Sequence, residues 1–174
     1  MKTKRLSDNI EKILNTQIVN EGYSSAIYRA MANCLEYNGW VGAAKLWKKY
    51  SSEEMAHYEK IISYMQDRDC MPIIPAIPQP QYKYEGIKNI VELSDKHEID
   101  VSGQWKKIAS EAMKESDLMT FELAQWFIGE QTEEEAKMIY WLDRIDMYEK
   151  TNKSLGDIDE EMEDMTQNTP PAQI

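Results

Sequence analysis

Four long segments of the chain repeat apolar residues at intervals of three and four, and this repeat constrains the fold more than any other feature of the sequence. Such spacing places the side chains on one face of an α-helix. The repeats cover residues 6–35, 40–65, 87–112 and 121–145. Each lasts about 28 residues, which is roughly 40 Å of helix at 1.5 Å per residue. Four amphipathic helices of similar length predict an all-α protein in which they pack as one four-helix bundle.

A proline-rich connection separates the second and third predicted helices. Its sequence is "CMPIIPAIPQPQYKYEG", and its prolines exclude a helix here. These prolines are Pro72, Pro75, Pro78 and Pro80. The connection is too long for a hairpin turn and about long enough to cross over the length of a bundle. We therefore expect the second and third helices to run parallel, and the helices joined by the two short connections to run antiparallel.

A weaker apolar stripe follows the fourth predicted helix and predicts a short C-terminal fifth helix. It consists of Leu155, Ile158, Met162 and Met165. The sequence "TQNTPPAQI" comes after it and lacks a helical pattern. We expect one bundle domain over residues 1–166 and a flexible C-terminal tail over residues 167–174.

Charge and composition narrow the choice of partners and compartment. The formal net charge of −11 disfavours binding to nucleic acid and to anionic membranes and favours the attraction of cations. No segment approaches the ~20 consecutive apolar residues of a membrane span, and the N-terminal "MKTKRLSDNI" lacks the apolar run of a secretory signal. Two cysteines without a CxxC pattern, Cys34 and Cys70, indicate a reducing compartment. These features predict a cytoplasmic protein.

Polar side chains interrupt every apolar stripe near its midpoint. They are Glu21, Glu54, His57, Glu98, Gln131 and Glu134. The midpoints of the helices in a bundle meet at one level, so these side chains are expected to share a small volume. A buried ionised carboxylate costs several kcal/mol, and no Lys or Arg falls on the stripes beside these residues. The pattern therefore predicts that cations compensate the four carboxylates.

The residue types indicate which cations these are. Two divalent ions would balance four carboxylates, and oxygen-rich ligand sets with a histidine suit iron or manganese. The spacing of Glu54 and His57 puts both side chains on one helix face, one turn apart. Both can then reach one ion while Glu54 bridges to a second, which is the arrangement of the di-iron carboxylate bundles.

Each of these residues also has an ordinary structural explanation when it is taken alone. A single glutamate on a stripe is commonly a boundary residue whose carboxylate reaches water. Tyr28 lies two turns after Glu21 on the same face, and we expect it in the core with its hydroxyl bonded to a site carboxylate. His97 lies one residue off its stripe, which favours a supporting or surface role over ligation. Only the joint pattern, with one break per helix at matching depth, favours a metal centre.

At these residues the chain resembles the ferritins, and most closely the non-haem bacterial ferritins. The matching pieces, one from each long helix, are "NEGYSSAIYRAM", "EEMAHYEKI", "DKHEIDVS" and "QWFIGEQTEEEAKM". They occur in the family's order and spacing, and the resemblance covers about residues 5–160. It implies a ferritin-like four-helix bundle and a ferroxidase that oxidises Fe(II) with O2 or H2O2. It also implies a shell of 24 identical subunits that stores the ferric mineral.

The resemblance also implies roles for individual residues. For the first iron it implies the ligands Glu21, Glu54 and His57. For the second iron it implies Glu54, Glu98 and Glu134, with Gln131 beside them. For a third iron site it implies Glu53, Glu130, Glu133 and Glu134. Tyr28 and Trp126 match aromatic residues that the family keeps beside the centre and that are linked to electron transfer.

The fourth helix separates this chain from other relatives. Bacterioferritins and rubrerythrin-like proteins repeat Glu-x-x-His there, whereas this chain has Gln131 and Glu134. Met55 falls where bacterioferritins keep a haem-ligating methionine, but non-haem members also carry "EEM", so we expect iron and no haem. Two other functions remain as alternatives. One is a di-iron carboxylate oxidase or oxygenase without mineral storage, and the other is a non-catalytic bundle for protein association.

Overall fold

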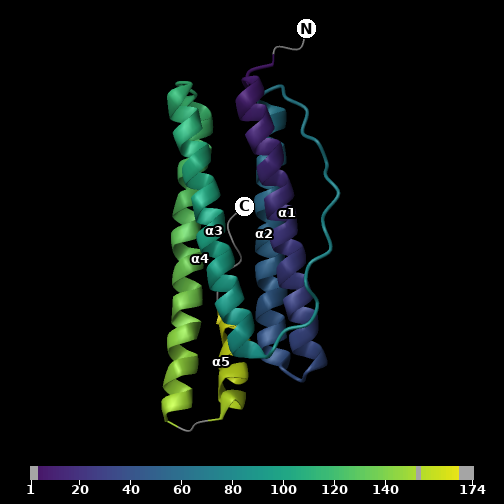
Figure 1. The fold of residues 1–174 in the computed structure, drawn as a ribbon, viewed down its shortest axis with the longest axis vertical. Coiled ribbons are helices and arrows are strands. Elements are labelled where there is room, and N and C mark those ends of the chain that lie inside the picture. The colour runs from purple at the N-terminus through teal and green to yellow at the C-terminus, as the bar shows by residue number, and fades with distance from the viewer. Residues whose placement is uncertain (1–3, 152–153, 169–174) are drawn as a thin grey trace.

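The computed structural model describes residues 4–151 and 154–168, and their regular structure is entirely helical. The helices, in chain order, are α1 (Asp8–Tyr37), α2 (Val41–Asp67), α3 (Ile87–Lys114), α4 (Leu118–Lys150) and α5 (Leu155–Asn168). The four long helices lie side by side, with α1 against α2 and α3 against α4 (Figure 1). The crossover between α2 and α3 runs the length of the bundle, so these two helices point the same way (Figure 1). The predicted all-α four-helix bundle with a long crossover and a short fifth helix is confirmed.

The ends of the long helices follow from local sequence. Ser7 precedes α1, and its hydroxyl accepts a hydrogen bond from the backbone N–H of Ile10. At the start of α4, the carboxylate of Asp117 accepts a hydrogen bond from the backbone N–H of Thr120. Side chains of these types satisfy N–H groups that the first turn of a helix leaves free. Gly39, with φ of 88°, makes the tight turn between α1 and α2 in a conformation that glycine adopts without strain.

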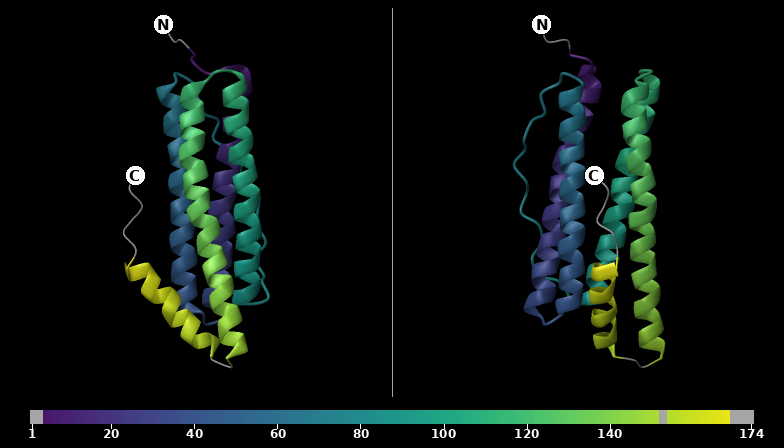
Figure 2. Two further views of the ribbon diagram at one scale, coloured as in Figure 1. Left: turned by 90° about the vertical axis from the view of Figure 1, so that its left-hand side faces the viewer. Right: turned by 180° about the vertical axis from the view of Figure 1, so that it is seen from behind.

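The N-terminus of α2 is capped by α5 rather than by its own preceding residue. The carboxylate of Asp159 accepts hydrogen bonds from the N–H groups of Gly42 and Ala43, at 3.1 and 2.8 Å. A Cβ at Gly42 would lie 1.9 Å from the carbonyl oxygen of Asp159, so only glycine allows this approach. Ile158 and Met162 are fully buried, and α5 lies beside the start of α2 (Figure 2). The fifth helix is therefore an integral part of the fold up to Asn168, and residues 169–174 of the predicted tail lie outside the described residues.

The core consists of two apolar clusters with a layer of buried polar residues between them. One cluster surrounds Trp47 and Trp141 and includes α5, and the other surrounds Trp105 and Phe127. Each long helix passes from one cluster to the other through the polar residues. We call these residues the polar layer: Gln17, Glu21, Ser24, Ser25, Ser51, Glu54, His57, Ser94, Glu98, Ser102, Gln131 and Glu134. The layer lies where the stripes predicted it.

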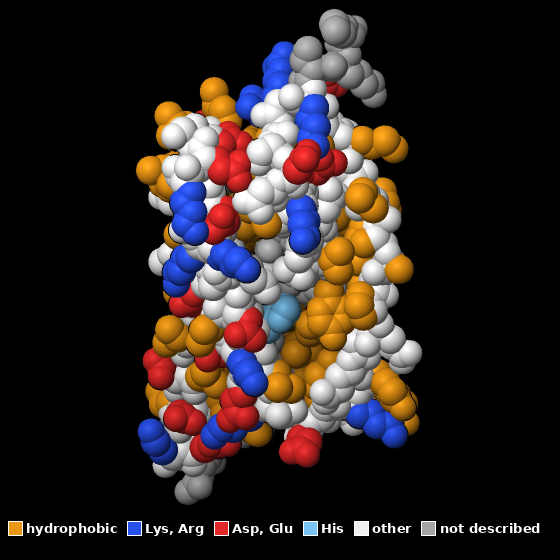
Figure 3. Space-filling view, turned by 45° about the horizontal axis from the view of Figure 1, so that its top comes forward, with side chains coloured by type: hydrophobic (Ala, Val, Ile, Leu, Met, Phe, Trp, Pro, Cys, Tyr) orange, Lys and Arg blue, Asp and Glu red, His pale blue; other side chains and the backbone are white. Residues whose placement is uncertain are grey.

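The surface adds two observations. None of the described helices is long and apolar enough to cross a membrane. Exposed apolar side chains gather on the side of the molecule that carries the crossover (Figure 3). Those of the crossover itself are Met71, Ile73, Ile74, Ile77 and Tyr82. A contiguous apolar surface of this kind is typical of a site of protein association.

Candidate metal centre

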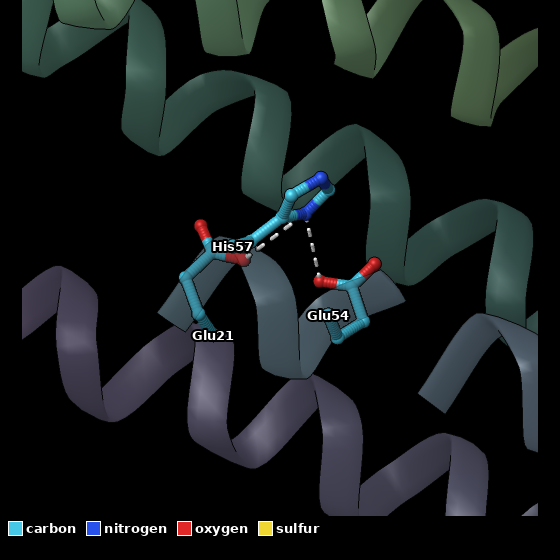
Figure 4. Close-up of side chains that lie close together, drawn as sticks. All are labelled: Glu21, Glu54 and His57. Atoms are coloured by element: carbon cyan, nitrogen blue, oxygen red, sulfur yellow. Dashed lines mark ion pairs between the residues drawn. The ribbon is translucent and has the colours of Figure 1, made fainter. Parts of the chain in front are cut away.

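Three side chains from α1 and α2 form the tightest group of potential metal ligands in the described part of the chain. Glu21, Glu54 and His57 each offer one ligand atom, and these atoms lie within 4.8 Å of one another. His57 Nδ1 lies 3.5 Å from Glu54 Oε2 and 3.9 Å from Glu21 Oε2, between the two carboxylates (Figure 4). We call this group the α1–α2 half of the centre.

Two atoms of the α1–α2 half are buried without a hydrogen bond. Glu21 Oε1 accepts hydrogen bonds from Gln17 Nε2 at 2.8 Å and from Trp105 Nε1 at 2.9 Å. Glu21 Oε2 and His57 Nδ1 are buried and lack a hydrogen-bond partner. Leaving a buried polar atom unsatisfied costs about 1–3 kcal/mol, so such atoms are uncommon in a finished core. A carboxylate and an imidazole facing each other in this way fit a cation between them.

The ionisation of the α1–α2 half shows how strongly it attracts positive charge. Burial and then the charge of Glu54 raise the pKa of Glu21 to about 8. Burial would lower the pKa of His57, but the neighbouring Glu54 outweighs it and raises this pKa to about 9. Burial alone would raise the pKa of Glu54, but the contact with His57 keeps it below the usual 4.5. A proton on His57 can therefore supply the positive charge that Glu54 requires.

Three further residues, from α3 and α4, form what we call the α3–α4 half: Glu98, Gln131 and Glu134. Both oxygens of Glu98 are satisfied by the protein, since the hydroxyl of Tyr28 donates to Oε1 and Gln131 Nε2 donates to Oε2 at 3.0 Å. The sequence-based prediction that Tyr28 bonds a site carboxylate is confirmed. Burial, together with the charge of Glu134, raises the pKa of Glu98 to about 8.

Glu134 has a cationic partner that the sequence analysis missed. Lys137 Nζ lies 2.7 Å from Glu134 Oε1 and 3.5 Å from Glu53 Oε2. Burial raises the pKa of Glu134 to about 7, although Lys137 acts in the opposite direction. The prediction that no Lys or Arg compensates the carboxylates is therefore wrong. Lys137 lies beside the stripe, and its long apolar stem carries the ammonium group inward.

The four residues predicted for a third iron site lie at the edge of the polar layer. Glu53 and Glu134 both form an ion pair with Lys137. Glu130 Oε2 lies 4.0 Å from His57 Nε2. The side chains of Glu53 and Glu130 are 17% and 32% exposed, and Glu133 is exposed. In the described part of the chain, only the three residues of the α1–α2 half form a group of ligand atoms within 4.8 Å.

The other aromatic and histidine residues lie around the centre. His97 is half-buried, with Nε2 2.7 Å from Ser24 Oγ and its ring edge-on to Tyr28. Trp126 is 37% exposed, and its ring centroid lies 5.8 Å from that of His57. The sequence analysis assigned no role to Trp105, yet its indole N–H donates a hydrogen bond to Glu21 and its ring stacks on Phe127 at 3.7 Å. An indole has an N–H that needs a partner when it is buried, and this was the available signal for the role.

Comparisons with known proteins point to one family. A family model described as a ferritin-like domain matches residues 11–148. A "Probable bacterial non-heme ferritin-like protein" of Haemophilus influenzae is 31% identical over 157 residues, which are 90% of this chain and 95% of the relative. A "Bacterial non-heme ferritin" of Escherichia coli O6:H1 is 32% identical over 160 residues, 91% and 96% of the two chains.

A solved structure supports the same relationship at the level of the fold. The open pore ferritin of the archaeon Archaeoglobus fulgidus superimposes with a TM-score of 0.88 at 25% identity. The match covers 91% of this chain and 98% of that one. With the family model matching residues 11–148, as the four motifs predicted, the chain belongs to the ferritin family.

Proposed function

We propose that this protein is a ferroxidase that oxidises Fe(II) to Fe(III) at an intrasubunit two-iron centre and stores the ferric product. The observation that carries the proposal is the pair of unsatisfied atoms, Glu21 Oε2 and His57 Nδ1, in the polar layer. The membership in the ferritin family and the names of the matched bacterial relatives support iron as the ion.

The proposed ligands divide between the two halves of the centre. Glu21, Glu54 and His57 hold the first Fe(II), and in this proposal Glu54 also contacts the second. Glu98 and Glu134 complete the second position, with the amide of Gln131 orienting Glu98. Glu53, Glu130 and Glu133 at the edge of the layer belong to a proposed third position together with Glu134. Carboxylate oxygens are hard ligands, which favour the more highly charged Fe(III).

The reaction balances with these residues as proton donors. Each of two Fe(II) ions gives up one electron. O2 accepts both electrons with two protons to form H2O2, or H2O2 accepts them with two protons to form two water molecules. Binding of the metal displaces protons from His57 and from the carboxyl groups with raised pKa values, so these groups supply protons when iron arrives. Tyr28 and Trp126 lie close enough to the centre to serve as further electron donors.

Storage requires that subunits assemble around a cavity. The exposed apolar side chains of the crossover support association with further copies of the chain (Figure 3). The proposed assembly is the 24-subunit shell that the resemblance implies, in the cytoplasm and without haem, nucleic acid or membrane as a partner. The net charge of −11 favours the approach of Fe(II) to such a shell.

An aerobic titration of the iron-free protein with Fe(II) tests this function. The measurement follows the oxidised iron that stays in solution. Uptake far beyond the few ions that the centre itself can hold is the expected result, because the product then enters a closed container. If uptake stops at two or three ions per chain and further iron precipitates, storage is contradicted. The alternative function, a di-iron carboxylate oxidase without mineral storage, would then replace it.

A further inference from the structure

One ammonium group lies within the seam between α2 and α4, at the edge of the proposed centre. Lys137 of α4 points its Nζ toward Glu134 on its own helix and toward Glu53 on α2, at 2.7 and 3.5 Å. The ring of Tyr50 lies below it, with its centroid 5.5 Å from Nζ. The lysine side chain is 30% exposed, so most of it is removed from water.

The surroundings of this ammonium group are those of a cation site. Glu53 Oε2 is buried and has no hydrogen bond, so the ion pair with Lys137 compensates it. Lysine carries a compact point charge at the end of a flexible stem. It can therefore occupy a cation site while its stem remains attached to the fold.

The position of Lys137 is incompatible with a metal ion on the same oxygen. A metal ion bonds a carboxylate oxygen at about 2.0–2.2 Å. An ion on Glu134 Oε1 would then lie within about 5 Å of the ammonium group, and two positive charges at that distance repel each other in a partly dry environment. The lysine must move out before Glu53 and Glu134 can share a metal ion.

We propose that Lys137 is a built-in occupant of the third metal position, so that the chain holds two ions and admits a third only when the lysine side chain leaves. This inference rests on the proposed two-iron centre. It assigns to Lys137 a role in setting the number of ions bound. Glu134 keeps its second oxygen for the second ion, because Lys137 contacts Oε1.

Titration with Zn²⁺ by calorimetry tests this role, because zinc does not change oxidation state and counts binding alone. The variants are Lys137→Met, which keeps the stem and removes the charge, and Lys45→Met as a matched control. Lys45 forms an ion pair with Glu163 on the surface, so its replacement changes the net charge equally without touching the centre. We expect Lys137→Met to bind about one more ion per chain than the wild type, and Lys45→Met to bind the same number as the wild type.

A second pair of variants locates the additional ion and guards against a loss of structure. Adding Glu53→Gln to Lys137→Met should abolish the gain, and Lys137→Arg, which keeps the charge, should bind as the wild type does. An unchanged number of ions in Lys137→Met, or a gain that survives Glu53→Gln, overturns the proposal. The number of Zn²⁺ ions that the wild type binds tests the two-iron centre. The role of Lys137 is tested separately, by the difference in that number between the variants and the wild type.

Discussion

The two halves of the polar layer differ in how far the protein's own groups satisfy them. In the α1–α2 half, Glu21 Oε2 and His57 Nδ1 face each other without a hydrogen bond. In the α3–α4 half, Glu98 accepts hydrogen bonds on both oxygens and Glu134 has the ammonium group of Lys137. An ion entering the first half breaks no hydrogen bond, whereas an ion that binds Glu98 must displace Tyr28 or Gln131. We therefore expect similar ligand types in the two halves to bind ions with unequal affinities, because their surroundings differ.

The largest expected effect is on the first ion. Replacing His57 by Ala removes the proposed nitrogen ligand of the α1–α2 half and should lower the affinity of the tighter ion and the rate of Fe(II) oxidation by about 100-fold or more. His97→Ala is the matched control, because it removes the chain's other histidine, which bonds Ser24 instead. Stopped-flow absorbance of the oxidised iron measures the rate. Equal losses of rate in the two variants would contradict the proposal that His57, and not His97, holds the first ion.

The second ion should be lost separately from the first. Glu98→Gln keeps the shape of the side chain but removes a charge from the α3–α4 half, so the weaker ion should lose about tenfold in affinity. The tighter ion should be unaffected, because Glu98 is absent from the group that Glu21, Glu54 and His57 form. A calorimetric titration resolves the two steps. Loss of both ions in this variant would show that the halves are not separable.

The stability of the metal-free protein should fall as the pH rises from 5 to 9. Glu21 and Glu98 have folded-state pKa values of about 8 against an ordinary 4.5, so the folded state keeps protons that the unfolded state releases in this range. The pKa of His57 is also raised, to about 9 from 6.5, so His57 adds a stabilising contribution that is lost as the pH rises from 6.5 to 9. The pKa of Glu54 is lowered, so its ionisation changes the stability only below pH 4.5 and contributes nothing between pH 5 and pH 9.

Denaturant unfolding in the presence of a chelator measures this pH dependence. The free energy of unfolding should drop by several kcal/mol between pH 5 and pH 9. Glu98→Gln should flatten the curve, because it removes one of the titrating groups. A free energy of unfolding that stays constant or rises over this range would contradict the burial of these carboxyl groups.

The smallest effect concerns the hydroxyl group that Tyr28 donates to Glu98. Tyr28→Phe leaves the ring in the core and frees Glu98 Oε1, so the metal-free protein should lose about 1 kcal/mol of stability. The second ion should bind a few-fold more tightly, since one competing donor is gone. Thermal unfolding and the calorimetric titration measure the two effects. Weaker binding of the first ion in this variant would argue against separate halves.

The sequence allowed much of the fold and of the α1–α2 half to be predicted. The apolar repeats specify which face of each helix is buried, and the midpoints of equally long helices meet at one level, so Glu21, Glu54 and His57 were expected together. The single-residue offset of His97 turns it away from that face, and it lies outside the group of ligand atoms. Periodicity is sufficient where the backbone position alone decides the environment.

The details of the α3–α4 half could not be predicted in the same way. Lys137 follows Glu134 by three residues on α4, a spacing at which opposite charges can meet, but its second contact, with Glu53, depends on the packing between α2 and α4. Trp105 donates to Glu21 across two helices, which depends on the distance between them and on the rotamers of both side chains. Contacts made by the ends of long side chains require the three-dimensional structure.

An anaerobic calorimetric titration of the metal-free protein with Fe(II) tests the two-iron centre without interference from oxidation, because it counts bound ions alone. We expect two ions per chain to bind in two unequal steps, and the tighter step should disappear in Glu54→Gln. Two equal steps would contradict the difference between the halves. A titration curve that Glu54→Gln leaves unchanged would contradict the assignment of the polar layer as the iron centre.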